Sequence, residues 1–191
     1  MDTLKVMDRD FSLKAKQLRR DGFIPGVILG GAEKASLSIQ IKEADAKKLL
    51  ATERVGSRIY LSLNEKLIPV QIKDKSLNPL KGEILNIDFQ ALQAGHKVNS
   101  VVHVVLENTD KITDILECMN MDIPYTALPK DMIDTVTIDV DGMGVGTTVM
   151  IKDVKELTNP ALEITEDPET IIFRIEAKKQ VEEEEEEKPA E

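Results

Sequence analysis

Tryptophan is absent from this chain of 191 residues, cysteine occurs once and histidine twice, and the shortage of cysteine and histidine limits the chemistry that the chain can perform. The single cysteine, Cys118, cannot form an intramolecular disulfide, so we predict a buried thiol and a reducing compartment. The two histidines, His96 and His103, lie seven residues apart in a strand-like run, with opposite facing parity. Cys118 has no predictable base beside it. The sequence therefore indicates neither a catalytic triad nor a metal cluster, and we predict a protein that is not an enzyme and needs no cofactor.

Long apolar runs are also missing. No segment approaches the roughly 20 apolar residues of a membrane-spanning helix, and the first residues lack the apolar core of a signal peptide. Glycines at 142, 144 and 146 resemble a phosphate loop, but the GxxxxGK(S/T) pattern is absent and no helix follows, so turns are the better interpretation. We expect a cytoplasmic protein with no membrane partner and no small-molecule substrate.

Charge is distributed unevenly along the chain. The net charge of −10 combines +4 from residues 1–93, with 16 basic and 12 acidic side chains, and −14 from residues 94–191, with 9 and 23. This asymmetry predicts that the first half of the chain binds a polyanion and that the second half is acidic. Seven of the 23 acids lie in residues 179–191, which include the run Glu182 to Glu187. Charges of one sign at this density oppose collapse, so we predict a disordered acidic tail.

Alternating apolar residues in the front half predict short strands. These are Thr3–Met7, Leu37–Ile41, Ile59–Leu63, Leu67–Ile72 and Glu83–Gln90, with a hairpin turn at 64–66. In the last strand Leu85, Ile87 and Phe89 should face the core, which turns Asn86 and Asp88 outward. The helix-forming run Lys42–Thr52 should cover an open end or edge of the sheet with Ala46, Leu49 and Leu50. Without a β-α-β rhythm, this pattern favours a small closed antiparallel barrel flanked by helices.

The rear half is also strand-rich. A break at Gln93-Ala94-Gly95 precedes alternating runs at Lys97–Glu107, Thr135–Val140 and Thr170–Ile175, while 78–82 is a loop by composition. We predict a mainly β protein of the α+β class, with a barrel domain at 1–93, a β-rich domain at 94–178 and the tail at 179–191.

Four cations fall within two turns of one predicted helix. Lys14, Lys16, Arg19 and Arg20 repel one another where they share a helix face, and a bound anion would relieve that repulsion. Ser12 is the predicted cap and Gly22 the predicted stop. Pro25 bars further helix before a strand at Gly26–Leu29. A solvated basic helix face is the alternative interpretation.

Three segments carry a family resemblance: LRRDGFIPGVILGG at 18–31, VQIKDKSLNPLKGEILNIDF at 70–89 and DTVTIDVDGMGVGTTVMIKDV at 134–154. Together they resemble the CTC general stress protein family, the two-domain form of large-subunit ribosomal protein twenty-five, from about Leu4 to Ile175. The resemblance implies a six-stranded barrel-like first domain that binds 5S ribosomal RNA in the bacterial large subunit, followed by a β-rich second domain. The implied partners are 5S ribosomal RNA and large-subunit ribosomal proteins.

The resemblance also implies roles for individual residues. Arg19 in the LR..G motif, Lys16 three residues earlier and Asp88 in the Asp-Phe pair match RNA-facing positions. The full set of candidate RNA-binding residues is Lys14, Lys16, Arg19, Arg20, Lys73, Ser76, Asn78, Asn86 and Asp88. Arginine suits phosphate or a guanine edge, lysine supplies a point charge, and a carboxylate accepts from base amino groups.

The chain departs from the family pattern at several positions. Leu29 stands where a tyrosine is common, Asn86 and Asn78 where histidines are common, and Ser76 where the family has a glutamine-like residue; the glycine-lysine-glycine before the basic helix is absent. Each lost hydrogen bond to a well-placed partner costs about 1 to 3 kcal/mol. An alternative function is therefore a ribosome-associated or free stress or interaction protein of the same fold, with weakened RNA binding and an acidic domain that meets basic neighbours.

Overall fold

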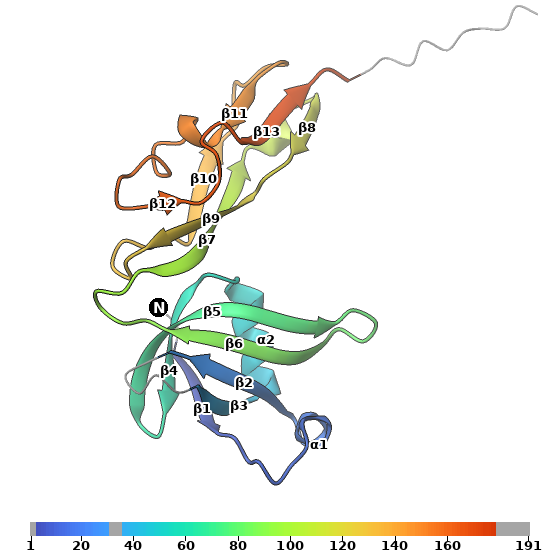
Figure 1. The fold of residues 1–191 in the computed structure, drawn as a ribbon. Helices are drawn as coiled ribbons and strands as arrows, with labels where there is room; N and C mark the ends of the chain where they lie inside the picture. Colours follow the sequence, from blue (N-terminus) through green and yellow to red (C-terminus); the bar gives the residue numbers. More distant parts are fainter. Residues whose placement is uncertain (1–2, 31–35, 179–191) are drawn as a thin grey trace, which may run out of the picture.

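The computed structural model describes residues 3–30 and 36–178, which form two β structures joined end to end (Figure 1). The mainly β fold class predicted above is confirmed. The predicted acidic tail at 179–191 lies outside the described residues. Within the described ranges, no helix is long and apolar enough to cross a membrane.

The first β structure is a closed barrel with the strand order β1-β3-β2-β6-β5-β4. Its strands are β1 (Thr3–Asp8), β2 (Phe23–Leu29), β3 (Leu37–Lys42), β4 (Arg58–Leu63), β5 (Lys66–Asn78) and β6 (Glu83–Ala91). The expectation of a purely antiparallel barrel is wrong, because β1 pairs in parallel with β4 and β2 in parallel with β6. The chain returns to the same end of the barrel between the members of each pair, which makes them parallel.

Helix α2 (Glu43–Thr52) follows the predicted boundaries closely. Its Ala46 and Leu49 are buried in the same cluster as the inward residues of the barrel strands, and Leu50 packs against that cluster. The helix contacts β1, β2 and β3. It covers the barrel core rather than a sheet edge, because a closed barrel has no edge to cover.

One of the core residues predicted for strand β6 is wrong. Ile84 is buried at 6% exposure, whereas Leu85 is only partly buried. Between Ser76 and Leu77 the register of β5 on β6 shifts: Ser76 pairs with Asn86, but Leu77 pairs with Ile84. Leu85 is the extra residue of this bulge, so the alternation of inward and outward side chains shifts by one residue there. Ile84, rather than Leu85, joins Ile87 and Phe89 in the core.

The β5–β6 hairpin is longer than the alternation predicted. Strand β5 continues past Ile72 to Asn78, through a second register shift between Ile72 and Asp74. Asn78 therefore ends a strand, whereas we expected it in a loop. The hairpin extends beyond the barrel wall (Figure 1).

The second β structure contains two sheets, with the strand orders β10-β7-β9-β12 and β11-β13-β8. The strands are β7 (Val98–Glu107), β8 (Ile115–Cys118), β9 (Asp122–Ala127), β10 (Thr135–Asp139), β11 (Thr148–Met150), β12 (Glu163–Ile164) and β13 (Ile171–Glu176); η1 (Thr109–Lys111) and η2 (Ile151–Asp153) are short 3-10 helices. A separate apolar core, which includes Tyr125 and Phe173, contains residues from both of these sheets.

Two predictions about this part have clear outcomes. Gly142 and Gly146 have φ angles of +77° and +87° and lie in turns, as predicted. The prediction of a buried thiol is wrong, because Cys118 is exposed. It is the last residue of β8, an edge strand of its sheet, so a strand lies on only one side of it, where it pairs with Phe173 of β13.

Candidate nucleic-acid interface

Helix α1 (Ala15–Arg20) is shorter than the predicted basic helix and lacks the predicted cap. The Ser12 backbone N–H and hydroxyl both donate to Asp10 Oδ1, at 2.8 and 2.6 Å, so Ser12 belongs to the preceding turn. Lys14 occupies the N-cap position without a side-chain capping bond. Gly22 follows the helix with φ +81°, which confirms the predicted stop. Strand β2 then begins at Phe23, three residues before the predicted start.

One buried residue fixes the orientation of α1. Leu18 is 1% exposed and anchors the helix, whereas Lys16 and Arg20 are exposed. Arg19 is partly buried, and its Nη1 donates to the Leu85 carbonyl oxygen at 3.2 Å. The bond joins α1 to β6 just before Gly26 pairs with Ile87, where β2 begins to pair with β6.

A hollow of about 380 Å³ separates α1 from the β5–β6 hairpin. Its lining residues are Lys16, Arg19, Arg20, Ile24, Glu43, Asn78, Lys81, Glu83, Ile84 and Leu85. The structure thus brings together three of the four predicted cations and Asn78. It adds Lys81, which the sequence analysis missed although its place after Pro79-Leu80 in a turn marked it as an exposed cation.

The electrostatics of this hollow favour an anion. Four cations line it against two carboxylates, and Glu43 is already paired with Lys47 at 2.7 Å on its own helix. Among the described residues, Lys16, Arg19, Arg20 and Lys81 have no carboxylate within 4.0 Å. Repulsion between these cations is therefore not relieved by ion pairs within the described parts of the chain.

A polar strip runs along the outer face of β6, beside this hollow. Asn86 Nδ2 donates to Asp88 Oδ1 at 2.5 Å, and both side chains are partly exposed, as the outward prediction requires. On the neighbouring strand β5, Ser76 pairs with Asn86 and Asp74 pairs with Asp88. The Asn86 amide is thereby held in one orientation, with Asp88 Oδ1 accepting its hydrogen bond.

The candidate residues therefore fall into two neighbouring groups. Lys16, Arg19, Arg20 and Asn78 line the hollow, while Ser76, Asn86 and Asp88 form the strip. Strand β6 connects them: Asp88 lies three residues, or roughly 10 Å, beyond the Leu85 carbonyl that Arg19 binds. Lys14 precedes α1, and Lys73 is exposed at a register shift of β5; neither lines the hollow.

Two family models match the chain. The Ribosomal L25p family matches residues 4–89, which include the barrel, and the model described as "Ribosomal protein TL5, C-terminal domain" matches residues 97–179. The large ribosomal subunit protein bL25 of Carboxydothermus hydrogenoformans is 30% identical over 175 residues, which are 90% of this chain and 86% of that protein. The chain belongs to the ribosomal L25p family.

Other bL25 relatives match over similar lengths. The protein of Moorella thermoacetica is 29% identical across 91% of this chain and 85% of its own, and that of Thermosipho africanus is 31% identical across 88% and 82%. The family resemblance found in the three sequence segments is confirmed. These are names of ribosomal structural proteins, which confirms the prediction that the chain is not an enzyme.

Proposed function

We propose that this protein is a structural component of the bacterial large ribosomal subunit and binds 5S ribosomal RNA through α1 and the adjoining surface of the barrel. The observation that carries the proposal is the hollow, where Lys16, Arg19, Arg20 and Lys81 gather without carboxylate partners in the described residues. The relatives' name, large ribosomal subunit protein, supports the ribosomal setting and with it a cytoplasmic location.

The two residue groups suit different parts of an RNA helix. The cations would contact phosphates, where charge neutralisation supplies most of the affinity. The strip would face the wide, shallow minor groove, where Asp88 accepts from a base amino group. The Asn86 amide oxygen, which has no hydrogen-bond donor among the described residues, would accept from a 2′-hydroxyl. Ser76 belongs to the strip, and Lys14 and Lys73 extend the proposed contact beyond the two groups. Recognition in this arrangement depends mainly on the shape of the RNA.

The division of labour along the chain is part of the proposal. Residues 1–93 form the RNA-binding domain, and residues 94–178 form a second domain. This second domain carries 7 basic and 16 acidic side chains, a net charge of −9. Phosphate would repel that charge, so the second domain would contact basic ribosomal proteins rather than RNA.

A salt titration tests the RNA contact directly. For about four phosphate contacts, the logarithm of the association constant for 5S RNA should fall with the logarithm of salt concentration at a slope of roughly −3 to −4. Arg19→Glu should weaken binding by about 100-fold or more and flatten the slope by about one. The matched control is Arg54→Glu, the same charge change at an exposed residue between α2 and β4, outside the hollow.

Two results would contradict this proposal. A slope near zero for the parent protein would mean that no phosphate is neutralised. Equal losses for Arg19→Glu and Arg54→Glu would show an effect of net charge alone.

The acidic second β structure and Leu29 favour a second candidate, a stress or interaction protein of the same fold that has lost tight RNA binding. Recovery of the protein with the large subunit at moderate salt supports the first function. Recovery in ribosome-free fractions alone supports the second.

A further inference from the structure

The connection from β1 to α1 is an ordered loop at the end of the barrel that lies away from the second β structure (Figure 1). The Arg9 N–H donates to the Ser38 carbonyl oxygen at 3.2 Å, and the Asp10 N–H donates to Gln40 Oε1, also at 3.2 Å. Asp10 Oδ1 accepts the two bonds from Ser12 described above. Residues on both sides of Phe11 are therefore held to the barrel or to each other.

Phe11 points away from the protein at the tip of this loop. It is 78% exposed, whereas Phe89, Phe173 and Tyr125 are fully buried and the chain's other two aromatic side chains are partly covered. Burial of a phenylalanine side chain normally stabilises a fold, because it removes apolar surface from water. Phe11 instead stays exposed, in a loop that its own hydrogen bonds hold in place.

Arg9 supports the ring from one side. Its guanidinium carbon lies 6.0 Å from the centre of the Phe11 ring, within the range of a cation–π contact. Arg9 Nε is buried and has no hydrogen-bond acceptor in the described parts of the chain, so no hydrogen bond at Nε competes with the contact to the ring. With one face near Arg9 and most of the ring exposed, Phe11 has an accessible aromatic face for a ligand.

The surroundings of Phe11 indicate what that ligand is. Its neighbours Asp10, Ser12 and Lys14 are exposed and polar, so the ring does not belong to an apolar patch that would fit a protein partner. Lys14 is three residues away, at most roughly 11 Å between Cα atoms, and leads directly into the basic helix. A polyanion that also carries flat aromatic groups matches both features, and nucleic acid is such a polymer.

We infer that Phe11, braced by Arg9, stacks on an unpaired nucleobase of the RNA that occupies the hollow beside α1. This inference rests on the proposed RNA-binding function and names a contact that the charged residues cannot supply. Stacking on an aromatic ring requires a base whose face is free, so Phe11 would select RNA with a looped or bulged nucleotide near the phosphates bound by α1.

Substitutions at Phe11 test the inference. Phe11→Ala and Phe11→Leu should both weaken 5S RNA binding by about 5- to 100-fold, because leucine keeps apolar surface but loses the ring; Phe11→Trp should retain binding. The salt slope should stay at its parent value in all three, since stacking releases no counterions. Val145→Ala, at another exposed apolar residue in the second β structure, should have no effect.

A fluorescence measurement tests the contact between residue 11 and the base directly. Because the chain has no tryptophan, Phe11→Trp contains a single indole, whose fluorescence should be quenched when 5S RNA is added. The single-tryptophan variant Val145→Trp should show no such change. A fully paired RNA duplex should bind the parent and Phe11→Ala equally, since it offers no free base.

The outcomes separate this inference from the function on which it rests. Tight, salt-dependent 5S RNA binding by the parent that is unchanged in Phe11→Ala would overturn the stacking contact and leave the RNA-binding proposal standing. Equal losses for Phe11→Ala on 5S RNA and on the paired duplex would also overturn it. If the parent itself does not bind 5S RNA, the proposed function fails and the stacking contact fails with it.

Discussion

At the scale of single residues, the outer face of β2 shows how one side chain can limit the proposed RNA contact. Leu29 is partly exposed and pairs with Gln90 on β6, two residues beyond Asp88 in the polar strip. Val27 pairs with Asp88 itself. The strip therefore borders an apolar edge at the position where the family commonly has a tyrosine hydroxyl.

Leu29→Tyr should strengthen 5S RNA binding, because a phenol adds a donor and acceptor next to the strip. One added hydrogen bond corresponds to about a five-fold gain in the association constant, measured by titration at fixed salt. Leu29→Phe is the control, since it adds a ring without a hydroxyl. Equal gains for the two variants would assign the effect to the ring, and no gain for either would place Leu29 outside the interface.

At the scale of elements, the position of the site depends on how closely β2 approaches β6. Gly26 lies opposite Ile87 in the parallel pair, and a Cβ at Gly26 would lie 2.7 Å from the Ile87 carbonyl oxygen. That contact is with backbone, which cannot rotate away. Glycine at this position lets β2 pair with β6 and keeps α1, which immediately precedes β2, within reach of Leu85.

Gly26→Ala should lower the free energy of unfolding by about 2 kcal/mol or more, because the added methyl group must displace a strand of the closed barrel. Chemical denaturation of the full chain measures this. Gly144→Ala is the matched control: its Cβ would have nothing within 4 Å, so its unfolding free energy should match that of the parent. A loss below about 0.5 kcal/mol at Gly26 would show that the barrel absorbs the methyl group.

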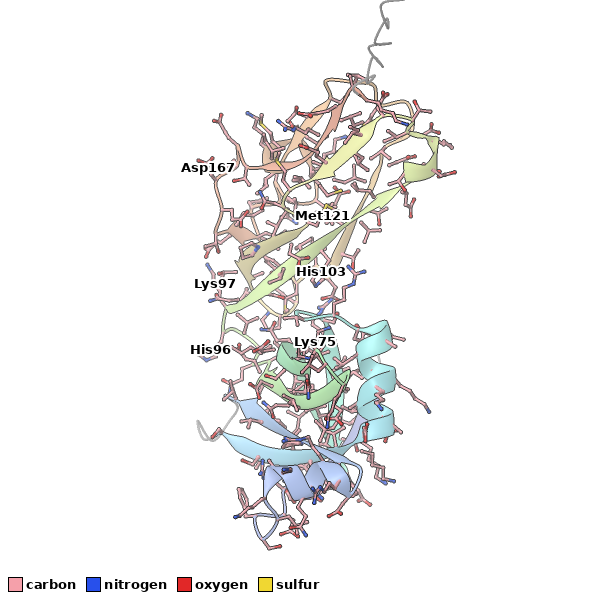
Figure 2. The ribbon with its side chains drawn as sticks, turned by 90° about the vertical axis from the view of Figure 1, so that its right-hand side faces the viewer. Lys75, His96, Lys97, His103, Met121 and Asp167 are labelled. Carbon is pink, nitrogen blue, oxygen red and sulfur yellow. The ribbon has the colours of Figure 1, made fainter. Side chains whose placement is uncertain are left out.

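At the scale of the whole molecule, specific hydrogen bonds join the barrel to the second β structure. Gln71 Nε2 donates to the Asn99 carbonyl oxygen at 2.8 Å, and Arg58 Nη1 donates to the Pro129 carbonyl oxygen at 2.9 Å. His103 is buried between the two parts, with Nε2 2.7 Å from the Val55 carbonyl oxygen and Nδ1 2.6 Å from Asp122 Oδ1 (Figure 2). His103 is thus a structural residue of this junction, in keeping with the absence of an enzymatic role.

Asp134 makes the junction sensitive to pH. Burial raises the pKa of its carboxyl group, and the nearby Arg58, with Nε 3.9 Å from Oδ1, opposes the shift without cancelling it. The folded state therefore holds the proton more tightly than the unfolded chain does. This contribution to stability is fully present below the unfolded pKa of about 3.9 and is lost as pH rises through the higher folded value.

Asp134→Asn should therefore gain stability relative to the parent as pH rises from about 4 towards neutrality, because the amide has no proton to lose. Unfolding free energies of both proteins across this range measure the difference. Asp110→Asn, which removes one exposed carboxylate from the second β structure, is the control for the change in net charge. A difference that is constant or shrinks with pH would mean that the ion pair with Arg58 outweighs burial.

Local patterns in the chain were sufficient to predict most elements and the position of the cations that line the candidate site. The period-two alternation located the strands of the barrel, the helix at 42–52 was recognisable from its apolar spacing, and Gly22 marked the end of α1. The basic residues of α1 could be identified because they follow one another closely in sequence. Each of these features depends on residues a few positions apart, which is the range over which side-chain periodicity carries information.

Features set by contacts between distant segments emerged only from the folded chain. The bulge at Leu85 shifts the alternation by one residue, and only the pairing of β5 with β6 reveals it. In the same way, the exposure of Cys118 follows from the edge position of β8, and the place of Lys81 in the hollow follows from the hairpin that carries it towards α1. Periodicity predicts which face of a strand a residue occupies. Strand order and barrel closure depend instead on hydrogen bonds between distant segments, and these bonds place the two residue groups of the candidate site side by side.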